Sequence, residues 1–282
     1  FLCRLAGKEG QVLAFDIQKQ ALESTRALLK SEGMEQKARL ILDSHENMAK
    51  YADEASVDGI CFNFGYLPGS DHSLATKPES SKNAVIEGLR LLKKGGRMGM
   101  VLPEGVLNTS NLQKIREYFE GEAKIILICS IPQDVFIAAG ATVKPSLVFF
   151  KRFTEEEELQ YLGAKTRAEK EIRQKYIGQI KALQEKIVEE KSKKLKVKAL
   201  IAAAEKELRD LEKAIIEEAK PLTKEYFHYE IPIAMVEDAG ITSTGAVSAG
   251  NQLPTLQDEY KEYRIAKKLW NEANSVVSYT IN

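Results

Sequence analysis

The sequence predicts an α/β fold with a mainly parallel sheet, an inserted α-helical hairpin and a small carboxyl-terminal segment. Residues 1–152 alternate short β-rich runs with amphipathic stretches, which is the pattern of strands joined by helices. Residues 153–220 are dominated by Glu, Lys, Ala, Leu and Ile. Residues 221–282 contain a β-rich run, a loop rich in Gly, Ser and Thr, and a last helical stretch. We expect these three segments to be the domains of the chain.

The first segment is expected to form a Rossmann-like core. Its strand candidates are short apolar runs, and its helix candidates carry apolar residues every three or four positions. The expected strands are residues 11–15, 38–42, 57–62, 97–102, 124–130 and 143–151, and the expected helices are residues 18–32, 80–92 and 111–119. Gly95 and Gly96 are expected to form a turn from helix to strand, since glycine adopts a positive φ without strain.

Two antiparallel helices are expected in the second segment. Apolar side chains recur at helical spacing in two series, and the basic stretch KSKKLKVK between them marks the connection. The first series is Ile172, Tyr176, Ile180, Leu183 and Ile187, and the second is Leu200, Ala204, Leu208, Leu211 and Ile215. These residues predict one packed seam in an otherwise solvated hairpin. In the third segment we expect a strand at residues 226–232 and a helix at residues 256–271.

Composition excludes several classes of protein. The net charge is zero, so the average composition indicates no attraction to nucleic acid. Cys3, Cys61 and Cys129 lie far apart, in or beside apolar runs, which predicts reduced core residues of a cytoplasmic protein and no metal site. No apolar stretch approaches the ~20 residues that cross a membrane, and no signal peptide is evident. The chain starts at Phe1 inside an apolar run, which is typical of a fragment.

Two acidic residues close consecutive predicted strands. Asp16 ends the run VLAFD, and Asp43 follows LIL in LILDSHE. An acidic side chain at the carboxyl end of a strand commonly accepts hydrogen bonds from the ribose hydroxyls of a nucleotide-like cofactor. The alternative for Asp16 is a helix N-cap. We expect Asp16 to hold the ribose and Asp43 to approach the adenine, and we interpret His45 as a surface loop histidine.

Asn63 is the strongest catalytic candidate. The stretch VDGICFNFGYLPGSD places it at the carboxyl end of a buried strand, where ligands bind in open α/β sheets. An Asn carbonyl can accept the N–H bonds of an amino group and direct the nitrogen lone pair towards a methyl donor. Tyr66 could stack on an extruded base, and Asp71 and Lys77 are candidate substrate contacts in the same loop. The alternative is an ordinary turn, in which these residue types are common.

This stretch resembles the fourth motif of class I S-adenosylmethionine-dependent methyltransferases that methylate amino nitrogens of nucleic acids. Residues 1–98 resemble small bacterial methyltransferases of the tRNA wobble uridine, through VLAFDIQKQAL, LILDSHEN, NFGYLPGSDHSLATKPESS and LLKKGG. That family methylates a primary aminomethyl nitrogen. The resemblance implies S-adenosylmethionine as cofactor, a cofactor role for Asp16 and a substrate role for residues 63–71. In the family a first strand and a Gly-rich loop precede FLCRLAG, so the core expected here lacks its first strand.

Residues 94–282 resemble another family, the carboxyl part of the methylation subunit of type I restriction–modification systems, which is an adenine-N6 DNA methylase. The matching stretches are GGRMGMVLPEGVL, IREYF, SIPQDVFIAAGATVKPSLVFFKR and YEIPIAMVEDAGITSTG. That family has Asn-Pro-Pro-aromatic where this chain has NFGY. The resemblance implies DNA as substrate and a DNA-specificity subunit as partner, contacted through the helical hairpin.

Both resemblances imply methylation of an amino nitrogen of nucleic acid, but on different polymers. The first expectation is adenine-N6 methylation of DNA in a restriction system, with the Gly-rich loop supplied. The runner-up is methylation of the tRNA wobble uridine. A non-catalytic assembly module is a third alternative, from a different class of protein. Both families share an LLK-Gly-Gly turn, so a chimera joined near residues 92–98 also fits the sequence.

Overall fold

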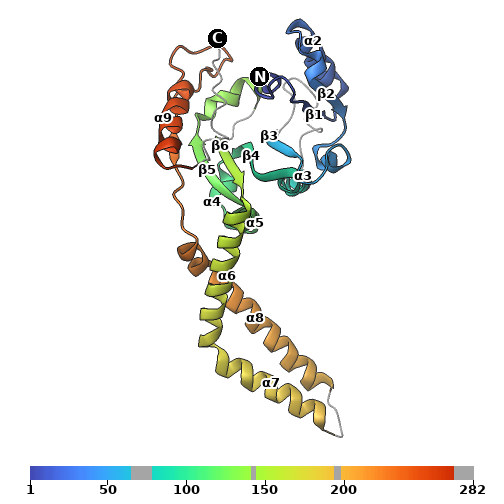
Figure 1. The fold of residues 1–282 in the computed structure, drawn as a ribbon, viewed down its shortest axis with the longest axis vertical. Helices are drawn as coiled ribbons and strands as arrows, with labels where there is room; N and C mark the ends of the chain where they lie inside the picture. The colour runs from blue at the N-terminus through green and yellow to red at the C-terminus, as the bar shows by residue number, and fades with distance from the viewer. Residues whose placement is uncertain (65–77, 141–143, 194–197, 270–282) are drawn as a thin grey trace. The chain divides into compact units, whose positions relative to one another are not determined.

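The computed structural model describes residues 1–64, 78–140, 144–193 and 198–269. They form two compact units (Figure 1). Unit 1 combines Phe1–Arg152 with the carboxyl-terminal part of the chain from Ile231, and unit 2 is Phe153–Glu230. In these described ranges no helix is long and apolar enough to cross a membrane.

Unit 1 is built on a five-stranded sheet with the strand order β3-β4-β6-β5-β7. The strands are β3 (Val57–Asn63), β4 (Leu92–Pro103), β5 (Ala123–Ser130), β6 (Pro145–Arg152) and β7 (Ile233–Met235). The α/β architecture is confirmed, because β3 and β4 are parallel and joined through helix α3 (Pro78–Leu91). The sheet is mainly parallel, as expected: four of its strands run in the same direction, and β6 is antiparallel to both neighbours. No long crossover helix separates β5 from β6, and parallel pairing would need one.

A second, two-stranded sheet carries the first part of the chain. Its parallel strands are β1 (Val12–Asp16) and β2 (Ala38–Leu42), joined through helix α2 (Lys19–Ser31). Every residue of β1 is half-buried, and Phe15 packs against the main core. The 3-10 helix η2 (His45–Lys50) follows β2 and lies against α3. The shorter helical segments of unit 1 are α1 (Leu2–Leu5), η1 (Glu35–Lys37), α4 (Gly105–Asn108), η4 (Ser110–Leu112) and η5 (Gln133–Ala139).

The core of unit 1 lies where one face of the five-stranded sheet meets α3 and helix α5 (Gln113–Glu122). Strands β4 and β6 send alternate side chains into it, as expected for strands with one covered face. Its least exposed members are Ala84, Leu89, Leu91, Leu92, Met98, Met100, Ala123, Val148 and Phe150. Gly88 lets α3 approach the sheet closely, because a Cβ there would lie 3.0 Å from Met98 Cε and 3.3 Å from Phe62 Cζ.

Strand β4 begins before the residue that the sequence pattern predicts. Leu92 pairs with Val57, and the next pair of the ladder is Gly59 with Arg97, so β4 contains extra residues in between. Gly95 has φ +76°, a conformation that glycine adopts without strain. The Gly-Gly stretch is therefore a bulge within β4 and not the helix-to-strand turn that we expected.

The carboxyl-terminal part of unit 1 adds β7 and helix α9 (Leu253–Ala266) to the sheet. Buried Val236 packs with Cys129, and Leu256 of α9 lies against this cluster. The prediction of a strand at residues 226–232 is wrong. Helix α8 continues through Tyr226, and the strand of this region is β7, which begins at Ile233. The reason is tertiary, because Phe227 contacts Phe153 and Tyr229 in an aromatic cluster of unit 2 and does not enter a sheet.

Unit 2 is a helical arm. Helix α8 (Lys198–Tyr226) runs beside both α6 (Glu155–Lys175) and α7 (Ile177–Ser192) (Figure 1). A capping box starts α6, in which Thr154 Oγ1 accepts from the Glu157 amide and Glu157 Oε2 accepts from the Thr154 amide. The first arm helix that we expected is divided at Tyr176, whose hydroxyl donates to Glu218 of α8.

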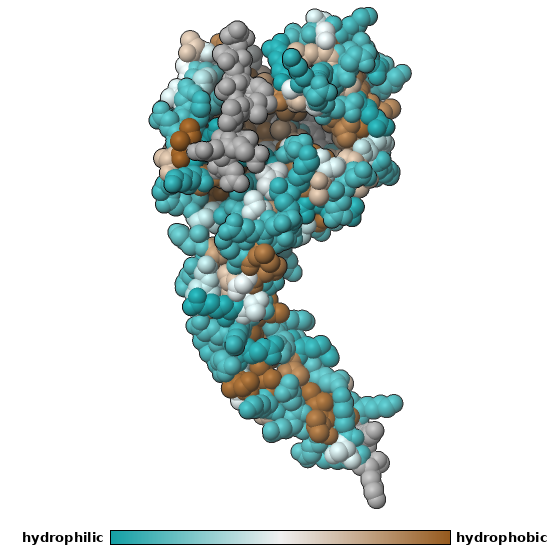
Figure 2. Space-filling view, in the orientation of Figure 1, coloured by the Kyte–Doolittle hydropathy of each residue, from teal (hydrophilic) through white to brown (hydrophobic). Residues whose placement is uncertain are grey.

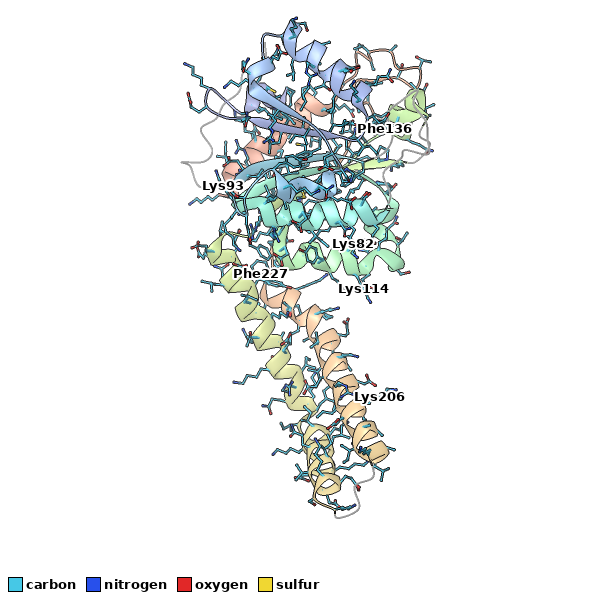
Figure 3. The ribbon with its side chains drawn as sticks, turned by 90° about the vertical axis from the view of Figure 1, so that its right-hand side faces the viewer. Lys82, Lys93, Lys114, Phe136, Lys206 and Phe227 are labelled. Atoms are coloured by element: carbon cyan, nitrogen blue, oxygen red, sulfur yellow. The ribbon has the colours of Figure 1, made fainter. Side chains whose placement is uncertain are left out.

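The expected seam of the arm is confirmed in its central part. Its buried side chains are Ala168, Ile172, Ile180, Ile187, Ala204, Ile215 and Ala219. Leu200 was expected in the seam but is 48% exposed, so that prediction is wrong. The arm surface is largely hydrophilic, with small apolar patches (Figure 2), and Lys206 of α8 projects outward from it (Figure 3). Helix propensity and one apolar seam together account for the stability of the arm.

Ile215→Ala is expected to destabilise the arm by about 2–5 kcal/mol, because it removes methylenes from a side chain that is only 1% exposed. The adjacent Ile216 is 45% exposed and provides a matched control. Ile216→Ala should change stability by about 0.5 kcal/mol or less. Amide hydrogen exchange of α6 and α8 measures both effects. Equal effects of the two substitutions would contradict the seam.

We also expect the β1–β2 pair to open before the main sheet. Among the described residues, each strand of this pair has one hydrogen-bonded neighbour, whereas β4 is paired along both edges. Strands with half-buried side chains and one paired edge have low local stability. Hydrogen exchange should therefore be faster for the amides of Leu13 and Leu40 than for those of Met98 and Val148. Similar protection of both groups would exclude this order of opening.

Candidate functional site

The carboxyl ends of β1, β2 and β3 carry the polar residues that the sequence singles out. Asp16 is the last residue of β1 and pairs with Leu42, the last residue of β2. Asp43 follows directly, so the two acidic residues are brought together as expected for adjacent parallel strands. Asn63 is the last residue of β3 and pairs with Val101. All three residues therefore terminate parallel-paired strands, which is where open α/β sheets bind ligands.

Asp16 makes a local turn with one carboxylate oxygen. Its Oδ1 accepts from the Gln18 amide at 2.8 Å. This contact agrees with the alternative role at the start of α2, although the N-cap position itself is Gln18. The second oxygen, Oδ2, forms no hydrogen bond within the described part of the chain. Asp16 can therefore serve the turn and still accept a hydrogen bond from a ligand.

The Asp43 carboxylate is occupied by its own neighbourhood. Oδ1 accepts from the Ser44 amide at 2.8 Å and from Asn47 Nδ2 at 2.7 Å, and Oδ2 accepts from the Tyr51 hydroxyl at 2.8 Å. The hydrogen bonds from Asn47 and Tyr51 lower the pKa of Asp43 from its usual value, and the carboxylate raises the pKa of Tyr51. Lys50 Nζ lies 3.9 Å from Oδ2. These contacts hold η2 on the end of β2.

His45 lies in a different environment from the surface loop that we expected. Its side chain is half-buried, and its ring meets the Phe64 ring edge-on with centroids 5.3 Å apart. Burial lowers its pKa, while the nearby carboxylates of Glu46 and Asp16 act in the opposite direction. Nε2 is buried and has no hydrogen-bond partner in the described part of the structure. An unsatisfied buried polar atom of this kind costs about 1–3 kcal/mol.

Asn63 is exposed at the end of β3, and aromatic rings lie beside it. Phe64 stacks on Phe62 with centroids 4.8 Å apart, and Phe62 is buried in the main core. The Asn63 amide makes no hydrogen bond to the described residues. Its backbone is therefore anchored by the sheet while its side chain remains available, which suits a group that binds a substrate. The other predicted loop residues, Tyr66, Asp71 and Lys77, lie outside the described ranges.

Sequence reasoning missed Asn47, Tyr51 and Phe64 as parts of this region. Asn47 and Tyr51 follow Asp43 by four and eight residues, so the spacing within DSHENMAKY was an available signal for their contacts. Phe64 follows Asn63 directly, but its contact with His45 joins the end of β3 to η2, and no sequence pattern indicates it.

A surface hollow lies nearby but is not part of this strand-end region. It has a volume of about 470 Å³ and is bounded by η2 and α3, with Glu46, Lys50, Glu87 and Arg90 among its lining residues. Neither Asp16 nor Asn63 lines it. In the described ranges, no cluster of three or more His, Cys, Asp or Glu side chains could hold a metal ion.

Two protein-family models match the chain. The model described as Putative rRNA methylase matches residues 12–123, and the model described as N-6 DNA Methylase matches residues 70–210. Asp16, Asp43 and Asn63 lie in the first match, whereas the helices α6 and α7 lie in the second.

Similar proteins match only part of the chain. The chloroplastic tRNA (mnm(5)s(2)U34)-methyltransferase of Arabidopsis thaliana is 38% identical over 100 residues, which are 34% of this chain and 36% of the relative. The chain thus spans about a third of that curated relative. A solved structure described as a putative rRNA-methylase, from Clostridium thermocellum, is 29% identical, with a TM-score of 0.44 over 54% of this chain and 80% of its own.

A second solved structure is a putative methyltransferase from Streptococcus mutans in complex with SAH. It is 28% identical, with a TM-score of 0.41 over 51% of this chain and 76% of its own. Of the two family models, the N-6 DNA Methylase model covers the larger share, half of the 282 residues. The chain therefore belongs to the N-6 DNA methylase family.

Proposed function

We propose that this protein is an S-adenosylmethionine-dependent methyltransferase that acts on an amino nitrogen of nucleic acid, with adenine N6 of DNA as the first candidate. The observation that carries the proposal is Asn63, an exposed amide at the carboxyl end of β3, which pairs in parallel with β4. Membership in the N-6 DNA methylase family supports adenine as the target.

The described residues fit the adenosyl half of the cofactor. Asp16 offers a carboxylate oxygen without a hydrogen bond at the end of β1, where a ribose diol could donate to it. The buried Nε2 of His45, without a partner, marks a second polar position in the same region. When bound, the cofactor supplies an electrophilic methyl group. We propose Asp16 for the ribose, and Asp43 as a support that holds η2 beside the adenine.

In this proposal Asn63 positions the reacting nitrogen. Its side-chain carbonyl accepts one N–H bond of the target amine, and a main-chain carbonyl beside it accepts the other. Both contacts orient the nitrogen lone pair without a strong base. Tyr66 is proposed as the stacking platform for the base, and Asp71 and Lys77 as contacts to the substrate.

A second candidate substrate is the tRNA wobble uridine. The segment that carries Asp16, Asp43 and Asn63 is the one that matches the rRNA methylase model, and the chloroplastic relative is named for its tRNA substrate. The chain has NFGY at residues 63–66, without the two prolines of the DNA methylase motif. These features favour an aminomethyl nitrogen, whereas the match over residues 70–210 favours adenine.

The arm is proposed as the contact to a DNA-specificity subunit. Its fold is internally complete, with a seam that buries Ile172, Ile180 and Ile215, so its outer faces are available to a partner. Charged pairs such as Lys191 with Glu205, 2.7 Å apart, lie across its helices and are exposed. Exposed pairs of this kind add little stability to the arm. In this proposal their charged side chains bind the partner subunit.

Asn63→Ala is expected to lower turnover roughly 100-fold while changing the affinity for S-adenosylhomocysteine little, because the amide orients the acceptor and not the cofactor. Radiolabelled methyl transfer to adenine-containing DNA and to bulk tRNA, with mass spectrometry of the methylated nucleoside, identifies the substrate. Asn83→Ala on α3 is the matched control and should leave turnover unchanged. Normal turnover of Asn63→Ala on both polymers would reduce Asn63 to a turn residue.

Removal of residues 168–220 is expected to abolish co-purification with a co-expressed DNA-specificity subunit and to leave unit 1 folded. Ala168 and Ala219 lie in one buried cluster, so the cut ends are close enough for a short Gly-Ser linker. Circular dichroism and hydrogen exchange of unit 1 check its folding. A parallel variant that lacks α9 provides the control. If the arm deletion still recovers the partner at wild-type yield, the arm is only a spacer.

A further inference from the structure

The geometry points to His45 as the residue that contacts the adenine of the cofactor at the end of β2, the role that the sequence suggested for Asp43. This inference rests on the proposed function and assigns one of its contacts. The ligand class is an adenosine derivative, and the contact is a hydrogen bond from the exocyclic amino group of adenine to Nε2 of His45.

Asp43 is less suited to this contact because its carboxylate already accepts three hydrogen bonds from its own neighbourhood. Oδ1 accepts from the Ser44 amide and Asn47 Nδ2, and Oδ2 accepts from the Tyr51 hydroxyl. Three donors within 2.8 Å hold the carboxylate in place. Oδ2 can accept a second hydrogen bond, but a ligand donor there would share the oxygen with the Tyr51 hydroxyl that holds η2.

His45, in contrast to Asp43, has an atom whose hydrogen-bonding capacity is not used by the described residues. Its Nε2 is buried and lacks a partner in the described ranges, although an imidazole nitrogen removed from water normally has one. Because Nε2 is covered in the free protein, a ligand has to displace the atoms over it, and it then supplies the hydrogen bond that they do not provide. The position is also suitable, since Asp16 is close enough to influence the charge of the imidazole and Phe64 contacts its ring. His45 therefore lies between the proposed ribose residue and the motif of Asn63.

The neutral imidazole is the form that can accept this bond. Burial lowers the pKa of His45 below its usual value, and this effect outweighs the carboxylates of Glu46 on η2 and Asp16 on β1, which both raise the pKa. At neutral pH the ring is therefore uncharged, and Nε2 can be an acceptor. Protonation removes the acceptor, so affinity should fall as the pH decreases through the pKa of His45. By linkage, the bound ligand should lower that pKa further.

Nuclear magnetic resonance of histidine-labelled protein tests the contact directly. The chain has three histidines, His45, His72 and His228, so assignment by single substitutions is simple. We expect S-adenosylhomocysteine to shift the His45 signals and to lower the pKa of His45, while the His228 signals stay unchanged. Saturable binding, seen in other signals, that leaves His45 unaffected would overturn this inference and leave the proposed function standing. Absence of any saturable binding would overturn both.

Variants separate hydrogen bonding from packing. His45→Phe keeps a ring against Phe64 but removes Nε2, and it should weaken binding of S-adenosylhomocysteine about tenfold. His45→Gln retains an acceptor and should restore part of the affinity. The wild type should discriminate against S-inosylhomocysteine, which has a carbonyl in place of the adenine amino group, and His45→Phe should lose this discrimination. Equal discrimination by both proteins would contradict the inference.

Asp43→Asn is the comparison variant. It should lower the melting temperature, because it weakens the contacts to Asn47 and Tyr51. The dissociation constant of the folded protein for S-adenosylhomocysteine, measured well below that melting temperature, should remain within about twofold of wild type. Loss of binding in folded Asp43→Asn together with normal binding in His45→Phe would return the adenine contact to Asp43.

Discussion

The double pairing of β4 is the constraint on which unit 1 depends. One edge of β4 pairs with β3 in parallel, and the other pairs with β6 in the antiparallel sense. Its alternate side chains Met98 and Met100 are buried among the helices of the core. On the opposite face, Gly99 accommodates the ring of Phe149, which would lie 3.3 Å from an added Cβ. Because β3 has its described partner only in β4, the position of Asn63 follows from this ladder.

The polar residues at the strand ends differ in the number of hydrogen bonds that they make within the protein. This difference separates structural roles from ligand-binding roles. Asp16, Asp43 and Asn63 occupy equivalent positions at the ends of parallel-paired strands, yet their hydrogen bonding differs. Within the described residues, the Asp43 carboxylate accepts three hydrogen bonds, the Asp16 carboxylate accepts one in a turn, and the Asn63 amide makes none. Buried or half-buried polar atoms that the protein leaves unsatisfied are the ones from which a ligand gains binding energy.

The arm is stabilised by different interactions from those that stabilise the sheet. Its stability comes from a narrow seam of side chains such as Ile172 and Ile215, together with helix propensity. The ion pair between Arg173 and Glu212 and that between Lys175 and Glu218 join α6 to α8, but both are exposed and therefore contribute little. An element of this kind tolerates changes on its outer faces, because those faces contribute little to its stability.

The sequence by itself determined the fold class, most element positions and the candidate residues. Short apolar runs such as those of β2 and β5, and the heptad-like series around Ile180 and Ala204, are local patterns that tertiary contacts reinforce. The catalytic hypothesis for Asn63 likewise depends only on its position at the end of an apolar run.

Only the tertiary structure decided the details that depend on long-range packing. The Gly95 bulge results from the register of β4 against β3, and the continuation of α8 past Pro221 accompanies buried contacts of Ala219 and Thr223. The antiparallel direction of β6, the hydrogen bonds to Asp43 and the contact of His45 with Phe64 were also decided by the tertiary structure. Sequence periodicity does not indicate any of these contacts. Sequence periodicity reports which side of an element is apolar, whereas register, hydrogen-bond satisfaction and burial are properties of the assembled elements.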